Sequence, residues 1–165
     1  MTTLRVIGIG EWQVSRDRGD ALRTYALGSC VGLVLHHPPT TTVGLVHILL
    51  PDSVNQPGGQ RKSPGYYVDT AVPLLLRAVL HAAGIHSPAA GSGVVAKLAG
   101  GATMGGLPFR VGERNIEAAE RLLRQYGIPL VGRDTGGTAA RTVTVEVASG
   151  AMVVKWVPGP SEVHL

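Results

Sequence analysis

Apolar residues dominate two neighbouring segments of the chain, residues 31–35 and 43–50. Neither segment alternates cleanly between apolar and polar positions, which is typical of strands that are covered on both faces. Residues 36–41, between them, contain two histidines, two prolines and two threonines, a composition that favours a turn. The pattern therefore predicts a β-hairpin whose strands are covered on both faces.

The predicted hairpin brings a thiol close to an imidazole. If the turn is centred between Pro38 and Pro39, Cys30 lies directly opposite His47. Directly opposed side chains have Cβ atoms about 4.5–5.5 Å apart. A register slip of one residue would send the two side chains to opposite faces of the sheet.

Two helices are predicted from apolar positions that recur with helical spacing. The first covers residues 69–83, with Asp69 as its N-cap and Gly84 at its end. The second covers residues 113–126 and ends at Gly127. Each has one wide apolar stripe, so both helices are expected to pack against a sheet.

Further strands are expected on both sides of these helices. They are predicted at residues 4–15, 94–99, 129–131, 142–147 and 151–157, with the last two joined as a hairpin. Because strands outnumber helices, the expected fold is α/β in the broad sense (α+β), a β-sandwich of mixed sheets flanked by helices. A polar glycine- and proline-rich segment at 51–64 predicts a mobile surface loop, placed to act as a lid beside His47.

Composition limits the class of protein. At 165 residues the chain fits a single domain, 1–165, with no internal repeat. The one cysteine excludes an internal disulfide, which favours a reducing compartment. We find no secretory signal and no run of about 18 apolar residues, so we expect a cytoplasmic protein without a membrane span.

The formal net charge of +4 and the pI near 9.6 raise the question of nucleic-acid binding. However, the basic residues are dispersed, and a single phenylalanine is available for base stacking. We therefore expect no nucleic-acid partner and favour an acidic protein partner.

Cys30 and His47 are the candidate catalytic pair. A free cysteine is more often a small buried hydrophobe than a nucleophile, and a histidine in an apolar strand is often a satisfied core residue. The predicted pairing favours nucleophilic catalysis, because an imidazole activates a nearby thiol. Gly28 and Ser29 predict a sharp turn just before Cys30, whose backbone N–H groups would line the site and receive an oxyanion.

Metal and nucleotide sites are weaker alternatives. Thiolate and imidazole suit zinc, but the hairpin places His36 and His37 about 20 Å from Cys30 at about 3.3 Å per residue. No phosphate-binding loop motif occurs, and the glycines at 101–106 lack the order of a dinucleotide fingerprint. We expect no metal and no cofactor.

A series of short motifs occurs in one order along nearly the whole chain. The first two are Thr24-x-x-x-Gly28-Ser29-Cys30-Val31 and Gly44-x-x-His47 followed by Leu50-Pro51. The later ones lie at residues 67–75, 97–102, 112–115, 127–129 and 134–137 and at Arg141. Together these motifs resemble the CheD family of chemoreceptor glutamine deamidases.

The resemblance implies roles for three residues and a fold. Cys30 would be the nucleophile, His47 the base, and Thr24 the third member that orients the imidazole. Nothing in the spacing alone obliges Thr24 to approach His47. The implied fold is a β-sandwich flanked by helices, similar to the catalytic domain of cytotoxic necrotizing factor toxins.

The resemblance also implies partners and leaves alternatives open. The substrates would be glutamines on the cytoplasmic helices of methyl-accepting chemoreceptors, converted to glutamate with release of ammonia. A second reading is a binding module that regulates the phosphatase CheC. A third is hydrolysis of a glutamate methyl ester by the same cysteine, because amide and ester pass through one thioester.

Overall fold

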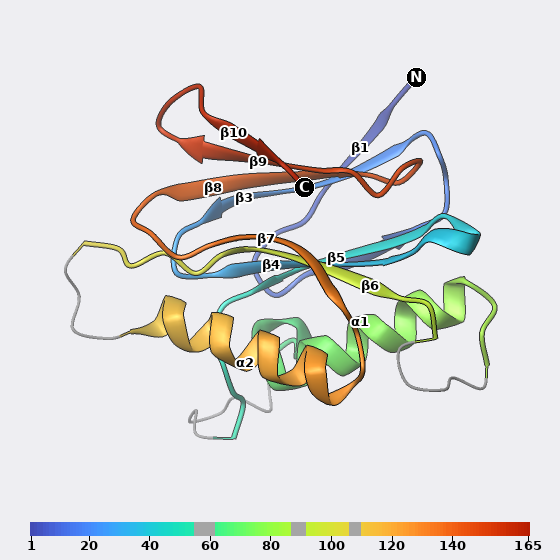
Figure 1. The fold of residues 1–165 in the computed structure, drawn as a ribbon, viewed down its shortest axis with the longest axis horizontal. Helices are drawn as coiled ribbons and strands as arrows, with labels where there is room; N and C mark the ends of the chain where they lie inside the picture. Colours follow the sequence, from blue (N-terminus) through green and yellow to red (C-terminus); the bar gives the residue numbers. More distant parts are fainter. Residues whose placement is uncertain (55–61, 87–91, 106–109) are drawn as a thin grey trace.

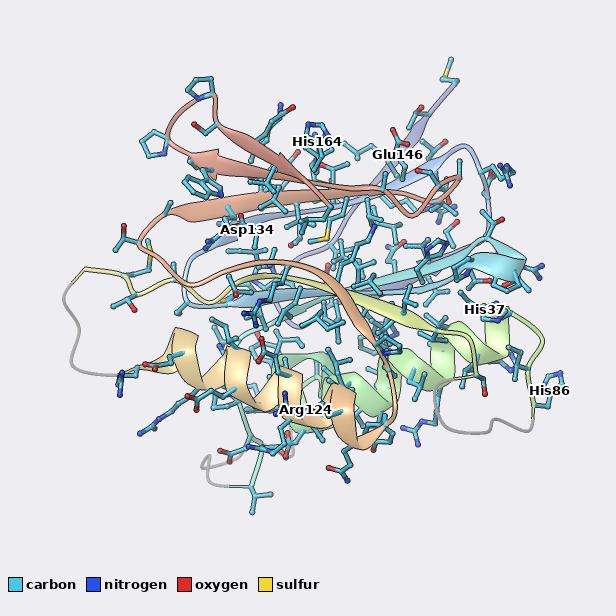
Figure 2. The ribbon with its side chains drawn as sticks, viewed as in Figure 1. His37, His86, Arg124, Asp134, Glu146 and His164 are labelled. Carbon is cyan, nitrogen blue, oxygen red and sulfur yellow. The ribbon has the colours of Figure 1, made fainter. Side chains whose placement is uncertain are left out.

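The computed structural model describes residues 1–54, 62–86, 92–105 and 110–165. Its elements form three layers: one β-sheet, a second β-sheet packed on it, and two helices on the far side of the second sheet (Figure 1). Side chains fill both spaces between these layers (Figure 2). The prediction of mixed sheets flanked by helices is confirmed, and the likeness to cytotoxic necrotizing factor stays a prediction.

The sheet next to the helices, here the inner sheet, contains the predicted hairpin at its centre. Its order is β2-β5-β4-β6-β7, and only the β6–β7 pair is parallel among the described pairs. Its strands are β2 (Trp12–Ser15), β4 (Val31–His37), β5 (Thr42–Ile48), β6 (Val95–Gly100) and β7 (Leu130–Thr135). β4 and β5 are buried along their whole length, as the unbroken apolar pattern predicts.

The other sheet, here the outer sheet, has no described helix on its far face. Its order is β1-β3-β8-β9-β10, with β1 and β3 parallel. Its strands are β1 (Thr3–Val6), β3 (Asp20–Leu27), β8 (Ala140–Glu146), β9 (Met152–Val157) and β10 (Glu162–His164). The predicted terminal hairpin is confirmed as β8–β9, whereas β10 was not predicted.

Helices α1 (Val68–Ala82) and α2 (Val111–Gln125) cover the inner sheet. Gly84 and Gly127 follow them with positive φ angles, which confirms both predicted helix ends. The predicted N-cap is wrong: Tyr67 occupies the N-cap position of α1 without a side-chain capping hydrogen bond, and the Asp69 carboxylate accepts hydrogen bonds from Ser53. Neither described helix has the length and hydropathy of a membrane-spanning segment.

The hairpin register differs from the predicted one by two residues. His47 pairs with Gly32, and not with Cys30. The reason is the turn, where a short 3-10 helix, η1 (Pro38–Thr40), and a left-handed Thr41 move the centre of the hairpin along the chain. Because side chains alternate with period two, a shift of two leaves every side chain on its predicted face.

The predicted first strand, 4–15, is also wrong, since it is two strands in different sheets. β1 joins the outer sheet and β2 the inner sheet. Between them Gly10 adopts a φ of +76° and donates its N–H to the His47 carbonyl at 2.8 Å. The chain thus crosses from one sheet to the other beside the candidate site.

The segment predicted as a lid, 51–64, lies partly outside the described residues, which resume at Lys62. Its described end includes a second 3-10 helix, η3 (Pro64–Tyr66). There the Tyr66 backbone carbonyl accepts hydrogen bonds from the N–H groups of Leu49 and Leu50, each at 3.0 Å. This end of the segment is therefore attached to the chain just after β5.

One polar cluster connects the two sheets at the end of the sandwich. Asp134 on β7, labelled in Figure 2, accepts hydrogen bonds from Arg141 on β8 at 3.1 Å and from Trp156 on β9 at 2.7 Å. The Arg141 guanidinium also lies over the Trp156 ring, 5.9 Å from the ring centroid. These contacts fix β7 against the outer sheet.

Candidate active site

His47 lies in the interior of the sandwich. It shares its face of β5 with Val43 and Leu45, which belong to the apolar cluster between the sheets, and it is 1% exposed. Its Nδ1 lies 2.7 Å from the Thr24 hydroxyl, which also lies 2.7 Å from the Ile7 carbonyl. A hydroxyl has one proton, and the Ile7 carbonyl can only accept it. Thr24 therefore accepts from Nδ1–H, which leaves Nε2 as the unprotonated ring nitrogen.

Thr24 reaches His47 because the two sheets pack face to face. It lies on β3 in the outer sheet and is fully buried. A β-bulge follows, in which Tyr25 and Ala26 together occupy the space opposite one residue of β8, and Ala26 has a φ of +57°. The bulge lets both Thr24 and Leu27 point inward although they are three residues apart.

The Nε2 atom of His47 is buried and has no hydrogen-bond partner within the part of the chain that the structure describes. Burial lowers the pKa of this imidazole from 6.5 to about 4, because the charged form loses its hydration. At neutral pH the ring is therefore neutral, and its Nε2 lone pair is free to accept a proton. A buried base without a hydrogen-bond partner lowers the stability of an apolar interior.

Cys30 lies on the connection between the two sheets, one residue before β4 begins. It belongs to the same interior cluster as Val34 and Leu45 and is 7% exposed. Burial raises the pKa of its thiol, and a hydrogen bond from its own backbone N–H opposes this rise in pKa. The resting thiol is therefore protonated at neutral pH.

Cys30 and His47 share one face of the inner sheet. Gly32 is the ladder partner of His47, and Cys30 is two residues before Gly32, so the two side chains are diagonal neighbours. Diagonal neighbours lie about 7–8 Å apart, which long side chains still bridge. The predicted direct opposition is wrong, but the predicted common face is confirmed.

Backbone contacts fix the bend that carries the thiol. The Cys30 carbonyl accepts the Gly101 N–H and the Gly28 carbonyl accepts the Ala102 N–H, both at 2.8 Å. Gly100 has a φ of +104°, and a Cβ added there would lie 2.3 Å from the Cys30 carbonyl oxygen. The predicted bend at Gly28 and Ser29 is present, but the Gly28 N–H donates to the Ala26 carbonyl at 3.0 Å.

Asn115 also contacts this bend, and sequence reasoning assigned it no role. It is fully buried on α2, and its Nδ2 donates to the carbonyls of Ser29 and Leu49, each at 3.0 Å. The available signal was its position on the apolar stripe of α2, four residues before Ala119 and eight before Leu123. A polar residue on such a stripe needs a buried partner.

The turn histidines lie at the opposite end of β4 from Cys30. His37 Nδ1 lies 2.8 Å from the Thr40 hydroxyl, and His36 pairs with Val43 in the ladder. Within residues 1–54, 62–86, 92–105 and 110–165, no group of three or more His, Cys, Asp or Glu residues is placed to hold a metal ion.

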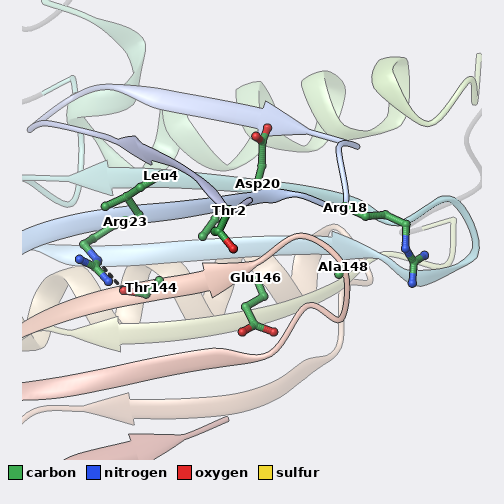
Figure 3. A pocket seen from close by; sticks show the side chains of 9 residues that line it. Thr2, Leu4, Arg18, Asp20, Arg23, Thr144, Glu146 and Ala148 are labelled. Atoms are coloured by element: carbon green, nitrogen blue, oxygen red, sulfur yellow. Dashed lines mark hydrogen bonds between the residues drawn. The ribbon is translucent and has the colours of Figure 1, made fainter.

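A cavity of about 520 Å³ is formed elsewhere, beside β1, β3 and β8 (Figure 3). Ala21, Arg23, Thr144 and Glu146 line it from the face of the outer sheet that points away from the sandwich. Leu22 and Thr24 point the other way along β3, into the interior. The cavity is therefore separated from Cys30 and His47 by the outer sheet.

Comparison with known proteins gives a consistent result. Residues 49–156 match the family model described as CheD chemotactic sensory transduction. The chain is 36% identical over 162 residues to the chemoreceptor glutamine deamidase CheD of Thermotoga maritima, with 98% of this chain and 97% of that protein covered. It is 38% identical over 151 residues to a probable chemoreceptor glutamine deamidase CheD of Syntrophotalea carbinolica (90% and 91% covered). A similarly named protein of Pyrococcus abyssi is 39% identical over 163 residues (96% and 95%).

Proposed function

The chain belongs to the CheD family, and from this membership we propose that it is a protein-glutamine deamidase that acts on chemoreceptors in chemotaxis. In this proposal Cys30 is the nucleophile, His47 the general base and Thr24 the residue that orients the imidazole. The observation that carries it is the 2.7 Å contact between Thr24 and His47 Nδ1, which leaves a buried Nε2 lone pair on the face that Cys30 shares.

The reaction begins when the Cys30 sulfur attacks the side-chain carboxamide carbon of a glutamine while Nε2 of His47 takes the thiol proton. The carbonyl oxygen becomes an oxyanion. The amide N–H groups of Ser29 and Cys30 are assigned to this oxyanion. Each such donor typically raises kcat by a factor of about 10²–10³.

The tetrahedral intermediate collapses when imidazolium gives its proton to the departing nitrogen, and ammonia leaves. A thioester between Cys30 and the substrate remains. Water, deprotonated by the same Nε2, attacks the thioester carbon and releases glutamate, while the proton returns to the sulfur. The net change is an amide plus water giving a carboxylic acid plus ammonia.

The two pKa shifts determine when the proton moves. Burial raises the pKa of the Cys30 thiol and lowers the pKa of His47 to about 4, so both groups are neutral at rest. The proton is therefore transferred during attack, and not in a preformed ion pair. Thr24 supports this step, since its hydroxyl remains a hydrogen-bond acceptor for Nδ1–H as the ring becomes positively charged.

The thiol and Nε2 must approach each other in the substrate complex, because they are diagonal neighbours in the free protein. Catalytic hydrogen bonds often tighten only when substrate binds. The direct test is ammonia release from a chemoreceptor cytoplasmic fragment. Activity in the wild type and its loss in Cys30→Ala support the proposal, and full activity in Cys30→Ala overturns the mechanism.

Partner regulation belongs to the same proposal on family grounds. A complex with the phosphatase CheC is expected where that partner is present. Pull-down with CheC and dephosphorylation rates with and without this protein test it. Methanol release from methylated receptor distinguishes ester hydrolysis from amide hydrolysis, since the thioester is common to both.

A further inference from the structure

The side chain of Asn115 connects two segments that the sheet does not connect. β4 begins at Val31 and β5 ends at Ile48, and these two residues form the last ladder pair on this side of the hairpin. The Ser29 and Leu49 carbonyls lie just beyond that pair, and both accept hydrogen bonds from Asn115 Nδ2 at 3.0 Å. Asn115 thus bridges the two chain ends where the ladder stops.

The orientation of the Asn115 amide follows from its partners. Two carbonyl oxygens need donors, and a flipped amide would place Oδ1 against both of them. In the present orientation Oδ1 is buried without a hydrogen-bond partner among the described residues. A buried polar atom without a partner is costly, and an apolar side chain on this stripe of α2 would avoid that cost. The residue is therefore not explained by packing alone.

The bridged carbonyls adjoin the two reactive residues. Ser29 immediately precedes Cys30, and Leu49 follows His47 by two residues. We propose that Asn115 is a positioning residue that sets the distance between the Cys30 thiol and the His47 imidazole by holding the Ser29 and Leu49 carbonyls together. Its effect on catalysis rests on the proposed deamidase function, whereas its effect on the thiol does not.

The variants that test this remove the donors in steps. Asn115→Ala removes both hydrogen bonds, and Asn115→Ser retains one donor on a shorter side chain. Leu122→Ala is the matched control, because it trims a partly buried residue of the same helix that packs on the core and has no side-chain donor for the Ser29 or Leu49 carbonyl. Thermal unfolding of each variant establishes the temperature at which all are folded.

Two readouts are then compared at that temperature. The first is the rate at which iodoacetamide alkylates Cys30 as a function of pH, which needs no receptor. The second is kcat and KM on a chemoreceptor fragment. We expect Asn115→Ala to shift the pH profile of alkylation and to lower kcat by about 10-fold to 10²-fold with little change in KM. In both readouts Asn115→Ser should lie between the wild type and Asn115→Ala, and Leu122→Ala should match the wild type.

The outcomes separate the two proposals. An unchanged alkylation profile and an unchanged kcat in folded Asn115→Ala overturn the positioning role. Failure of both Asn115 variants to fold also overturns it, because the bridge would then serve the whole fold. If the wild type releases no ammonia, the deamidase function fails, and the alkylation profile alone still decides whether Asn115 positions the thiol.

Discussion

The Thr24 hydroxyl and His47 Nδ1 lie 2.7 Å apart although they belong to different sheets. This contact crosses the interior of the sandwich, so the packing of the two sheets determines the orientation of the imidazole. It also fixes the tautomer, since the same hydroxyl donates to the Ile7 carbonyl. The nitrogen that we propose as the general base is thereby defined by a residue of the other sheet.

Thr24→Val tests this relationship. The substitution keeps the shape but leaves Nδ1–H and the Ile7 carbonyl buried without a partner, at a cost of about 1–3 kcal/mol for each group. We expect kcat to fall by roughly 10²-fold or more, because the ring loses its orientation and tautomer preference. Thr24→Ser is the control, since it keeps the hydroxyl and should retain most of the activity. Equal activities of the Val and Ser variants would contradict the assigned role.

The stability of the protein should depend on pH through His47. The pKa of His47 is about 4 in the folded protein and 6.5 for an unperturbed histidine. As the pH falls, the unfolded chain therefore binds a proton at this residue before the folded protein does. The contribution is complete above pH 6.5 and is lost as the pH falls toward 4, amounting to about 3 kcal/mol of unfolding free energy. Urea unfolding at a series of pH values measures it.

The matched protein for this measurement is His47→Gln. Burial, with Lys97 and His37 nearby, also lowers the pKa of His36, which adds its own loss of stability at acidic pH in both proteins. The difference between the two curves therefore isolates His47. We expect the wild type to lose more stability than His47→Gln between pH 6.5 and pH 4, and parallel curves would refute the pKa shift.

Gly100 should be required for the placement of Cys30. A Cβ there would lie 2.3 Å from the Cys30 carbonyl oxygen, at a φ of +104°. Gly84→Ala is the control, because Gly84 also has a positive φ, but apart from its chain neighbours no atom of the described residues lies within 4 Å of its added Cβ. Both changes carry backbone strain of about 1–2 kcal/mol. We expect only Gly100→Ala to lose activity in the deamidation assay, and equal effects of both changes would show that the close approach is unimportant.

The sequence predicted the central hairpin better than its register. Cys30 and His47 share the predicted face because the error was an even number of residues. The exact pairing depended on the turn geometry at Thr41, whose left-handed conformation no local pattern signalled. The sequence therefore placed Cys30 and His47 on the correct face but assigned His47 the wrong ladder partner.

The positions of Thr24 and Asn115 depended on tertiary structure. Thr24 meets His47 through sheet packing and a bulge at Tyr25 and Ala26, neither of which leaves a periodic signal. Its role was predicted only through the family motif. Asn115 interrupts an apolar stripe, which indicates a buried polar contact, but the identity of the two carbonyls required the fold.

The central claim is that the Cys30 sulfur converts receptor glutamines to glutamates. It is tested most directly by mass spectrometry of peptides from a chemoreceptor fragment after incubation with wild type or Cys30→Ala. The account predicts that specific glutamine peptides gain the mass of an amide-to-acid conversion with the wild type and remain unchanged with the variant. Equal conversion by both proteins, or none by the wild type, would contradict it.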